Sequence, residues 1–210
     1  QLFWMKTRPA LMYISTLLLV VISTLPTFEG LTVNAELLMM MPVTAAVLIM
    51  WNVAERSREG QRSAWDKYLV AGLLGGIGWL FKIPVVADMV ALGLYFFVFN
   101  KASLREGIRA LFSWSFVSYV AAFVAPLLLT FAYYYLKGTG PDYLATVLTV
   151  NLGYVSSWST STYVFNPFRS GLFVRALVLG VFTLFVYGLR KRMDKRFVLV
   201  VLWATFALFG

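Results

Sequence analysis

The chain has no cysteine and no histidine among its 210 residues. Without cysteine it has no disulfide and no thiol nucleophile, and without either residue it lacks the usual ligands for haem and zinc. The absence of histidine also excludes imidazole acid–base catalysis and histidine-based triads. Charged residues are scarce as well, at 13% of the chain against about 25% in soluble domains. Any chemistry therefore depends on carboxylates, lysine, arginine, asparagine and tyrosine.

Apolar residues make up 60% of the chain, and the mean hydropathy is +0.79. Because a helix rises about 1.5 Å per residue, about 20 apolar residues cross a hydrocarbon core of about 30 Å. The sequence therefore predicts an all-α polytopic membrane protein, a single transmembrane domain with apolar runs at residues 9–28, 37–54, 68–99, 111–136, 172–189 and 197–210. The last run is too short to cross, and no signal peptide precedes the first. We therefore expect an internal piece of a longer membrane protein, with part of the active site elsewhere.

The run at residues 68–99 is too long for one crossing, since 32 residues would extend about 48 Å as a single helix. Lys82-Ile83-Pro84 interrupts it, because proline removes a backbone donor and pushes the preceding residue out of the α region. Two structures fit this pattern: one kinked helix, or a hairpin of two short helices at residues 68–81 and 85–99.

The distribution of positive charge favours the hairpin. The net charge is +9, from 18 lysines and arginines against nine acidic residues. With a hairpin, fourteen of the 18 fall on the cytoplasmic side, as the positive-inside rule requires, whereas one kinked helix would move eight of them outside. The fourteen are Lys6, Arg8, Arg56, Arg58, Arg62, Lys67, Lys101, Arg105, Arg109, Arg190, Lys191, Arg192, Lys195 and Arg196. Their position between apolar runs indicates topology and excludes a nucleic-acid partner.

Residues 29–36, 82–84 and the long polar loop 137–171 then face outward. Lys82 is the most informative of these residues, because a lysine at the centre of a membrane helix costs about 2.5–3.5 kcal/mol. Beside a helix break it can contact a phosphate in the outer leaflet, or it can extend to the interface as a purely structural residue. Asp88, six residues later, is its nearest partner, and we expect an ion pair that either orients Lys82 or serves structure alone.

Further polar residues on the same side are candidates for the substrate cavity. Asn34 and Glu36 open the second run, where they either cap the helix or face the cavity. Asn151 and Tyr154 end a short amphipathic stretch in the outer loop, and the tyrosines and tryptophans there either form an interfacial belt or stack on a sugar ring. Arg169 and Arg175 are further candidate phosphate ligands, since arginine binds phosphate in a bidentate manner.

Four glycines lie before the break in the long run, at positions 72, 75, 76 and 78. They do not make a dinucleotide-binding fingerprint, since no soluble strand precedes them. We expect them to allow close helix packing instead.

Three stretches, in order, resemble bacterial membrane glycosyltransferases. They are STLPTFEGLTVNAELLMMMPVTAAVLIM, with its short outer loop ending in Asn-x-Glu; YLVAGLLGGIGWLFKIPVVADMVALGLYFF, with a glycine-rich helix, Lys-x-Pro and a second short helix; and YYYLKGTGPDYLATVLTVNLGYV, with Asn-x-x-Tyr. The chain is similar to polyprenyl-phosphate-sugar-dependent transferases of the GT-C fold, such as protein O-mannosyltransferases and lipid A aminoarabinose transferases.

This resemblance implies a fragment of a GT-C transmembrane bundle in the cytoplasmic membrane, with its active face outward. It implies inverting transfer of a sugar from a polyprenyl-phosphate donor. Membrane lipid and this donor are the expected partners, and neither a metal nor another cofactor is identified. Lys82, Arg169 and Arg175 would bind the donor phosphate, and the cavity would include Asn34, Glu36, Asp88, Asn151 and Tyr154. The family's catalytic acidic residue lies upstream of the matched segments, so the general base is not assigned to Glu29, Glu36 or Asp142.

Two other functions fit parts of the pattern. A secondary transporter also has broken helices and charges at mid-membrane, but it predicts an inverted repeat, and we find only one broken run. A non-catalytic membrane scaffold leaves Lys82 and the polar outer loop without a role.

Overall fold

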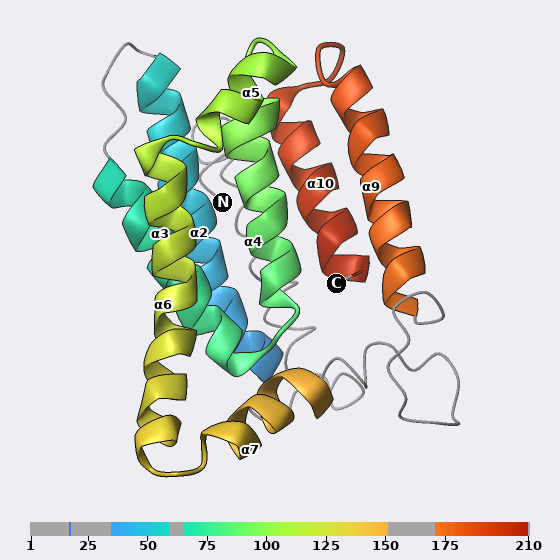
Figure 1. Cartoon of the computed structure of the whole chain (residues 1–210). Coiled ribbons are helices and arrows are strands. Elements are labelled where there is room, and N and C mark those ends of the chain that lie inside the picture. Colours follow the sequence, from blue (N-terminus) through green and yellow to red (C-terminus); the bar gives the residue numbers. More distant parts are fainter. Residues whose placement is uncertain (1–16, 18–34, 59–64, 151–170, 210) are drawn as a thin grey trace.

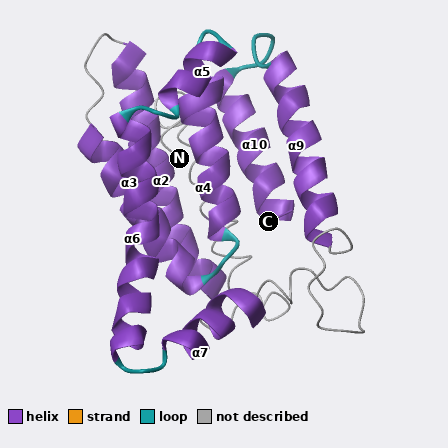
Figure 2. Cartoon of the chain, in the orientation of Figure 1, coloured by secondary structure: helices purple, strands orange, loops and turns teal. Residues whose placement is uncertain are grey.

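The computed structural model describes residues 17, 35–58, 65–150 and 171–209, and this part of the chain is all-helical, without strands (Figures 1 and 2). The elements are α2 (Ala35–Arg58), α3 (Trp65–Phe81), α4 (Val85–Gly93), the π-helix η2 (Leu94–Phe99), α5 (Leu104–Ala110), α6 (Trp114–Leu136), α7 (Gly140–Leu144), the π-helix η3 (Ala145–Val150), α9 (Gly171–Leu189) and α10 (Lys195–Phe209). The all-α class predicted from the sequence is thus confirmed. The expected span at residues 9–28 lies outside the described residues, apart from residue 17.

The long apolar run folds as two helices. α3 ends at Phe81, and α4 begins at Val85 after the turn that contains Pro84. The amides of Val86 and Ala87 donate to the carbonyls of Ile83 and Pro84, both at 2.9 Å, so the carbonyls of the turn are already paired where α4 begins. In Figure 1, α3 and α4 run in opposite directions from this turn. The break therefore lies at one end of the helical bundle.

Two serines set boundaries that the apolar pattern does not reveal. α6 begins at Trp114, three residues after the run starts, because Ser113 caps it by accepting from the amide of Phe116 at 3.3 Å. Ser103 caps α5 in the same way, through the amide of Glu106 at 3.3 Å. The short helix α5 differs from the sequence prediction, which places a cytoplasmic segment without a helix at residues 100–110.

The glycines of α3 bring its backbone against its neighbours. A Cβ at Gly72 would overlap the carbonyl of Tyr119, and one at Gly76 would overlap the carbonyl of Phe123 and lie 2.9 Å from the ring of Pro126. A Cβ at Gly75 would overlap the side chain of Met89 on α4. The close helix packing expected from these glycines is confirmed, and α3 contacts the backbone of α6 directly.

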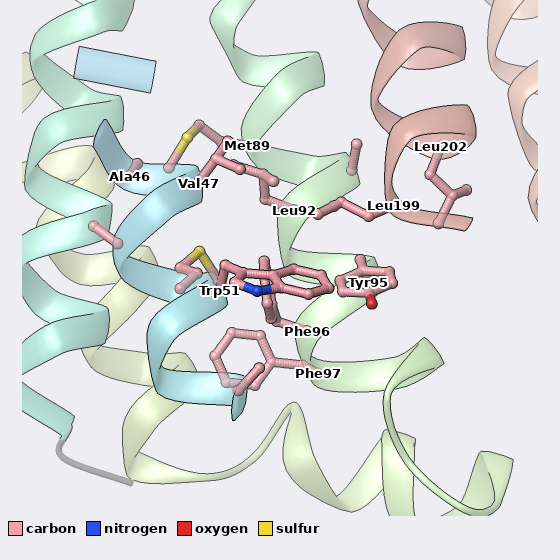
Figure 3. Close-up of a cluster of buried hydrophobic side chains, with 14 of the residues drawn as sticks. Ala46, Val47, Trp51, Met89, Leu92, Tyr95, Phe96, Phe97, Leu199 and Leu202 are labelled. Atoms are coloured by element: carbon pink, nitrogen blue, oxygen red, sulfur yellow. The ribbon is translucent and has the colours of Figure 1, made fainter. Parts of the chain in front are cut away.

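Aromatic side chains fill the space between α2, η2 and α10 (Figure 3). Trp51 of α2 stacks on Tyr95 of η2, with ring centroids 6.3 Å apart and an interplanar angle of 16°. Leu199 and Leu202 of α10 are fully buried in the same cluster. α4 and η2 are therefore packed on both sides, while the outer helices have exposed faces.

Those exposed faces are apolar. On α9 the exposed side chains are Phe173, Val174, Leu177, Val178, Val181, Leu184 and Phe185. α3 presents a second stripe that includes Leu69, Leu73, Ile77 and Leu80. Two helices, Leu38–Arg56 and Trp114–Leu136, are long and apolar enough to cross a membrane. Water-soluble monomers rarely expose continuous apolar surface of this kind.

The contact between α3 and α6 provides a test of the packing. Gly76→Ala should lower the free energy of unfolding by about 1–3 kcal/mol, because the added methyl group overlaps a backbone carbonyl that cannot rotate away. The change is measured as the midpoint of thermal unfolding in detergent. Gly180→Ala on α9 is the matched control, since a Cβ there has nothing within 4 Å. Equal midpoints for the two variants would contradict the glycine-mediated contact.

Candidate functional site

The two ends of the bundle differ in charge. One end has residues 55–58, 65–67, 100–113 and 190–196, and the other has the 82–84 turn, α7 and the first residues of α9 (Figure 1). Of the basic residues in the described part of the chain, eleven belong to the first end: Arg56, Arg58, Lys67, Lys101, Arg105, Arg109, Arg190, Lys191, Arg192, Lys195 and Arg196. The other end has three, Lys82, Lys137 and Arg175. This second end is the candidate site.

Lys82 lies directly at the helix break. Its amide donates to the carbonyl of Gly78 at 3.2 Å, which closes the last turn of α3, and its carbonyl accepts from the amide of Val85 at 3.3 Å. The residue is half-buried. The backbone of Lys82 is therefore fixed on both sides. The position of its ammonium group depends on the conformation of the four-carbon side chain.

Asp88 does not form the ion pair that we predicted with Lys82. Its carboxylate is 5% exposed and accepts a hydrogen bond from the indole nitrogen of Trp203, with Nε1 and Oδ1 2.9 Å apart. Lys82 precedes the turn, and a separation of six residues does not bring side chains together as three or four residues do on a helix. The buried carboxylate therefore joins α4 to α10 instead of orienting the lysine.

A second buried hydrogen bond joins α4 to α6. The hydroxyl of Tyr119 donates to the carbonyl of Met89 at 2.7 Å, and Tyr119 is 4% exposed. Its ring lies beside Gly93, where a Cβ would be 3.6 Å from it. Adjacent residues of α4 are thus bonded to two different helices. Asp88 is bonded to α10, and Met89 is bonded to α6.

Few of the other predicted site residues lie in the described part of the chain. Arg175 lies near the start of α9 and is half-buried, at the same end of the bundle as the break (Figure 1). Glu36 lies in the first turn of α2, but its side chain is outside the described residues. Outside them altogether are Asn34, Asn151, Tyr154 and Arg169. Among the residues that the structure describes, no three acidic side chains form a group that could hold a metal ion.

Two contact residues of this end were missed by the sequence analysis. Trp203 lies in the run 197–210, which the sequence predicts only as an incomplete span. Buried indole N–H groups usually find an acceptor, and this is the signal that could have found it. Tyr143 of α7 pairs with Thr130 of α6, with their hydroxyl oxygens 2.7 Å apart. Only the folded structure shows this second pair, because a turn of the chain brings the two residues together.

Comparisons with protein-family models, with curated proteins and with solved structures give no match for this chain. The resemblance to polyprenyl-phosphate-sugar transferases therefore depends on the three stretches of sequence alone.

The pair of Asp88 and Trp203 predicts a measurable coupling. Trp203→Phe should destabilise the fold by about 1–3 kcal/mol more than Trp65→Phe, a change at an exposed tryptophan, because it leaves a buried carboxylate without its donor. In an Asp88→Leu background the same substitution should cost less, since no acceptor then remains. A double-mutant cycle of thermal unfolding in detergent measures this difference. Strict additivity would show that the hydrogen bond adds no stability.

Proposed function

We propose that this chain is part of a multi-pass membrane glycosyltransferase of the GT-C type in the cytoplasmic membrane. The enzyme transfers a sugar from a polyprenyl-phosphate donor to an acceptor at the outer face. The observation that carries the proposal is the helical hairpin whose turn presents Lys82 at the end of the bundle opposite the basic segments. It supports the part of the resemblance that concerns Lys-x-Pro between two short helices.

The distribution of charge and apolar surface supports the orientation. The eleven basic residues at one end match the cytoplasmic side that the positive-inside rule requires. The exposed apolar faces of α3, α6 and α9 match contact with lipid chains. In this orientation the 82–84 turn and α7 lie at the outer side of the membrane.

The chemistry of transfer explains why a cation is needed at this place. When the sugar leaves the donor, the lipid phosphate gains negative charge, and a fixed cation stabilises that charge more strongly at a low-dielectric site than in water. Lys82 provides this cation, with Arg169 and Arg175 as further candidates. A carboxylate must remove the proton of the acceptor hydroxyl, and we place that base in a segment upstream of the matched stretches.

The orientation can be tested by thiol labelling, because the chain has no native cysteine. Cysteines placed at Ser103 and Met193 should resist an impermeant thiol reagent added outside cells. A cysteine at Thr139, after α6, should react, and it serves as the positive control. Labelling of Ser103 or Met193 from outside would overturn the proposed topology.

The role of Lys82 is tested by charge removal. In the membrane enzyme that contains this chain, Lys82→Met should abolish or greatly reduce sugar transfer from the polyprenyl-phosphate donor. Lys82→Arg should retain part of it, since the charge stays while the geometry changes.

Lys137→Met is the matched control for this variant. Lys137 lies at the same end, directly after α6, and its ammonium group is 5.8 Å from the centre of the Tyr133 ring. Its loss should leave transfer near normal. Near-normal transfer by Lys82→Met in correctly inserted protein would show that Lys82 is a structural residue.

A further inference from the structure

We propose that Thr130, Tyr134 and Tyr143 form the surface that binds the sugar of the lipid-phosphate donor. This inference rests on the proposed function, in which Lys82 binds the donor phosphate. It assigns the sugar to a cluster at the corner between α6 and α7. In that corner the paired hydroxyl groups of Thr130 and Tyr143 lie beside the stacked rings of Tyr134 and Tyr143.

The register of α3 against α6 places this cluster relative to Lys82. Gly72 contacts Tyr119 and Ala122, and Gly76 contacts Phe123 and Pro126, so the two helices run in parallel and advance together. Lys82 is six residues beyond Gly76, which is about 9 Å along the axis. Thr130 lies about 8 Å beyond the point midway between Phe123 and Pro126. Lys82 and Thr130 are therefore at nearly the same height in the bundle.

The cluster also lies on the face of α6 that points toward α3. Residues 119, 122, 123 and 126 contact the glycines of α3, and Thr130 and Tyr134 continue this stripe at intervals of four residues. Because α3 ends at Phe81, this part of the stripe has no α3 residues opposite it. Tyr143 contacts this part of the stripe instead, from α7, which starts beside the end of α6 in Figure 1.

A backbone turn fixes α7 in this position. α6 ends in a Schellman motif, in which the amide of Thr139 donates to the carbonyl of Tyr134 and that of Gly138 donates to Tyr135, both at 3.0 Å. Gly138 has a φ of 80°, which residues with a Cβ rarely adopt. The chain therefore reverses within a few residues and returns Tyr143 to the stripe.

The hydrogen bonds leave acceptor capacity for a ligand. The hydroxyl of Thr130 lies 2.9 Å from the carbonyl of Leu127 and 3.0 Å from that of Pro126, so its single proton is donated to the backbone. Tyr143 must then donate to Thr130, at 2.7 Å. The lone pairs of the Tyr143 oxygen remain as acceptors, which suits the hydroxyl groups of a sugar.

The aromatic part of the cluster suits the apolar face of a sugar ring. Tyr134 stacks on Tyr143, with centroids 4.8 Å apart and an interplanar angle of 17°. Tyr134 is still 41% exposed, so a ligand can reach it. It lies four residues beyond Thr130, about 6 Å further out. In the donor the sugar is the next group outward from the phosphate, so a phosphate at Lys82 brings the sugar to the level of these rings.

The experiment compares lipids with and without the sugar. Affinities of the chain in nanodiscs are measured for undecaprenyl phosphate and for a panel of undecaprenyl-phosphate sugars carrying mannose, glucose or 4-amino-arabinose. Tyr143→Phe should lower the affinity for the tightest-binding sugar-bearing lipid about fivefold to tenfold, the loss of about one hydrogen bond. Thr130→Val should lower it in the same direction, because the Tyr143 hydroxyl then loses the acceptor that orients it. Both should leave bare undecaprenyl phosphate unchanged. Tyr134→Leu should act in the same direction through lost stacking.

Matched variants separate this inference from the proposed function. Tyr133→Phe removes a neighbouring hydroxyl and should leave the affinities for bare and sugar-bearing lipid unchanged. Lys82→Met should lower both affinities. If Lys82→Met changes neither affinity, the proposed function fails. If Lys82→Met weakens both lipids but Tyr143→Phe and Thr130→Val do not discriminate between them, the sugar surface alone is overturned. A panel in which no sugar-bearing lipid binds more tightly than bare phosphate also overturns it.

Discussion

The direct contact between the backbones of α3 and α6 is the constraint on which the arrangement of this end of the bundle depends. Two glycines on one face of α3 remove the side chains that would hold the helices apart, and so the carbonyls of Tyr119 and Phe123 lie against α3. This contact fixes the relative height of the two helices. The residues beyond this contact, from the break at Lys82 to Thr130 and Tyr134 of α6, take their positions from that register.

Hydrogen bonds then fix the short second helix of the hairpin. A buried carboxylate or carbonyl loses its hydration, and a hydrogen bond from a protein donor offsets that loss. Asp88 accepts a hydrogen bond from the indole of Trp203, and the carbonyl of Met89 accepts one from the hydroxyl of Tyr119. With one hydrogen bond from α10 and one from α6, the first turn of α4 is fixed in position. This is the turn that directly follows Lys82 and Pro84.

The sequence predicts the parts of this structure that depend on local chemistry. Pro84 ends a helix wherever it lies, and glycines at helical spacing allow close packing, so the break and the α3 face could both be inferred. The helix at Leu104–Ala110 could also have been found, since Ser103 and Glu106 have the spacing of a capping box. The partner of Asp88 could not, because Trp203 is 115 residues away and pattern alone cannot choose it over Lys82.

In the proposed membrane orientation, the unequal lengths of the helices have a consequence for the bilayer itself. α6 has 23 residues, about 35 Å, whereas α3 has 17, about 26 Å, and a bilayer cannot match both. In a membrane that fits α6, the outer leaflet must thin beside the hairpin, or headgroups and water must enter above the turn. A transferase of the proposed kind would then deform the lipid around its own site. Bilayer thickness, set by acyl chain length, would decide how easily a lipid phosphate descends to Lys82.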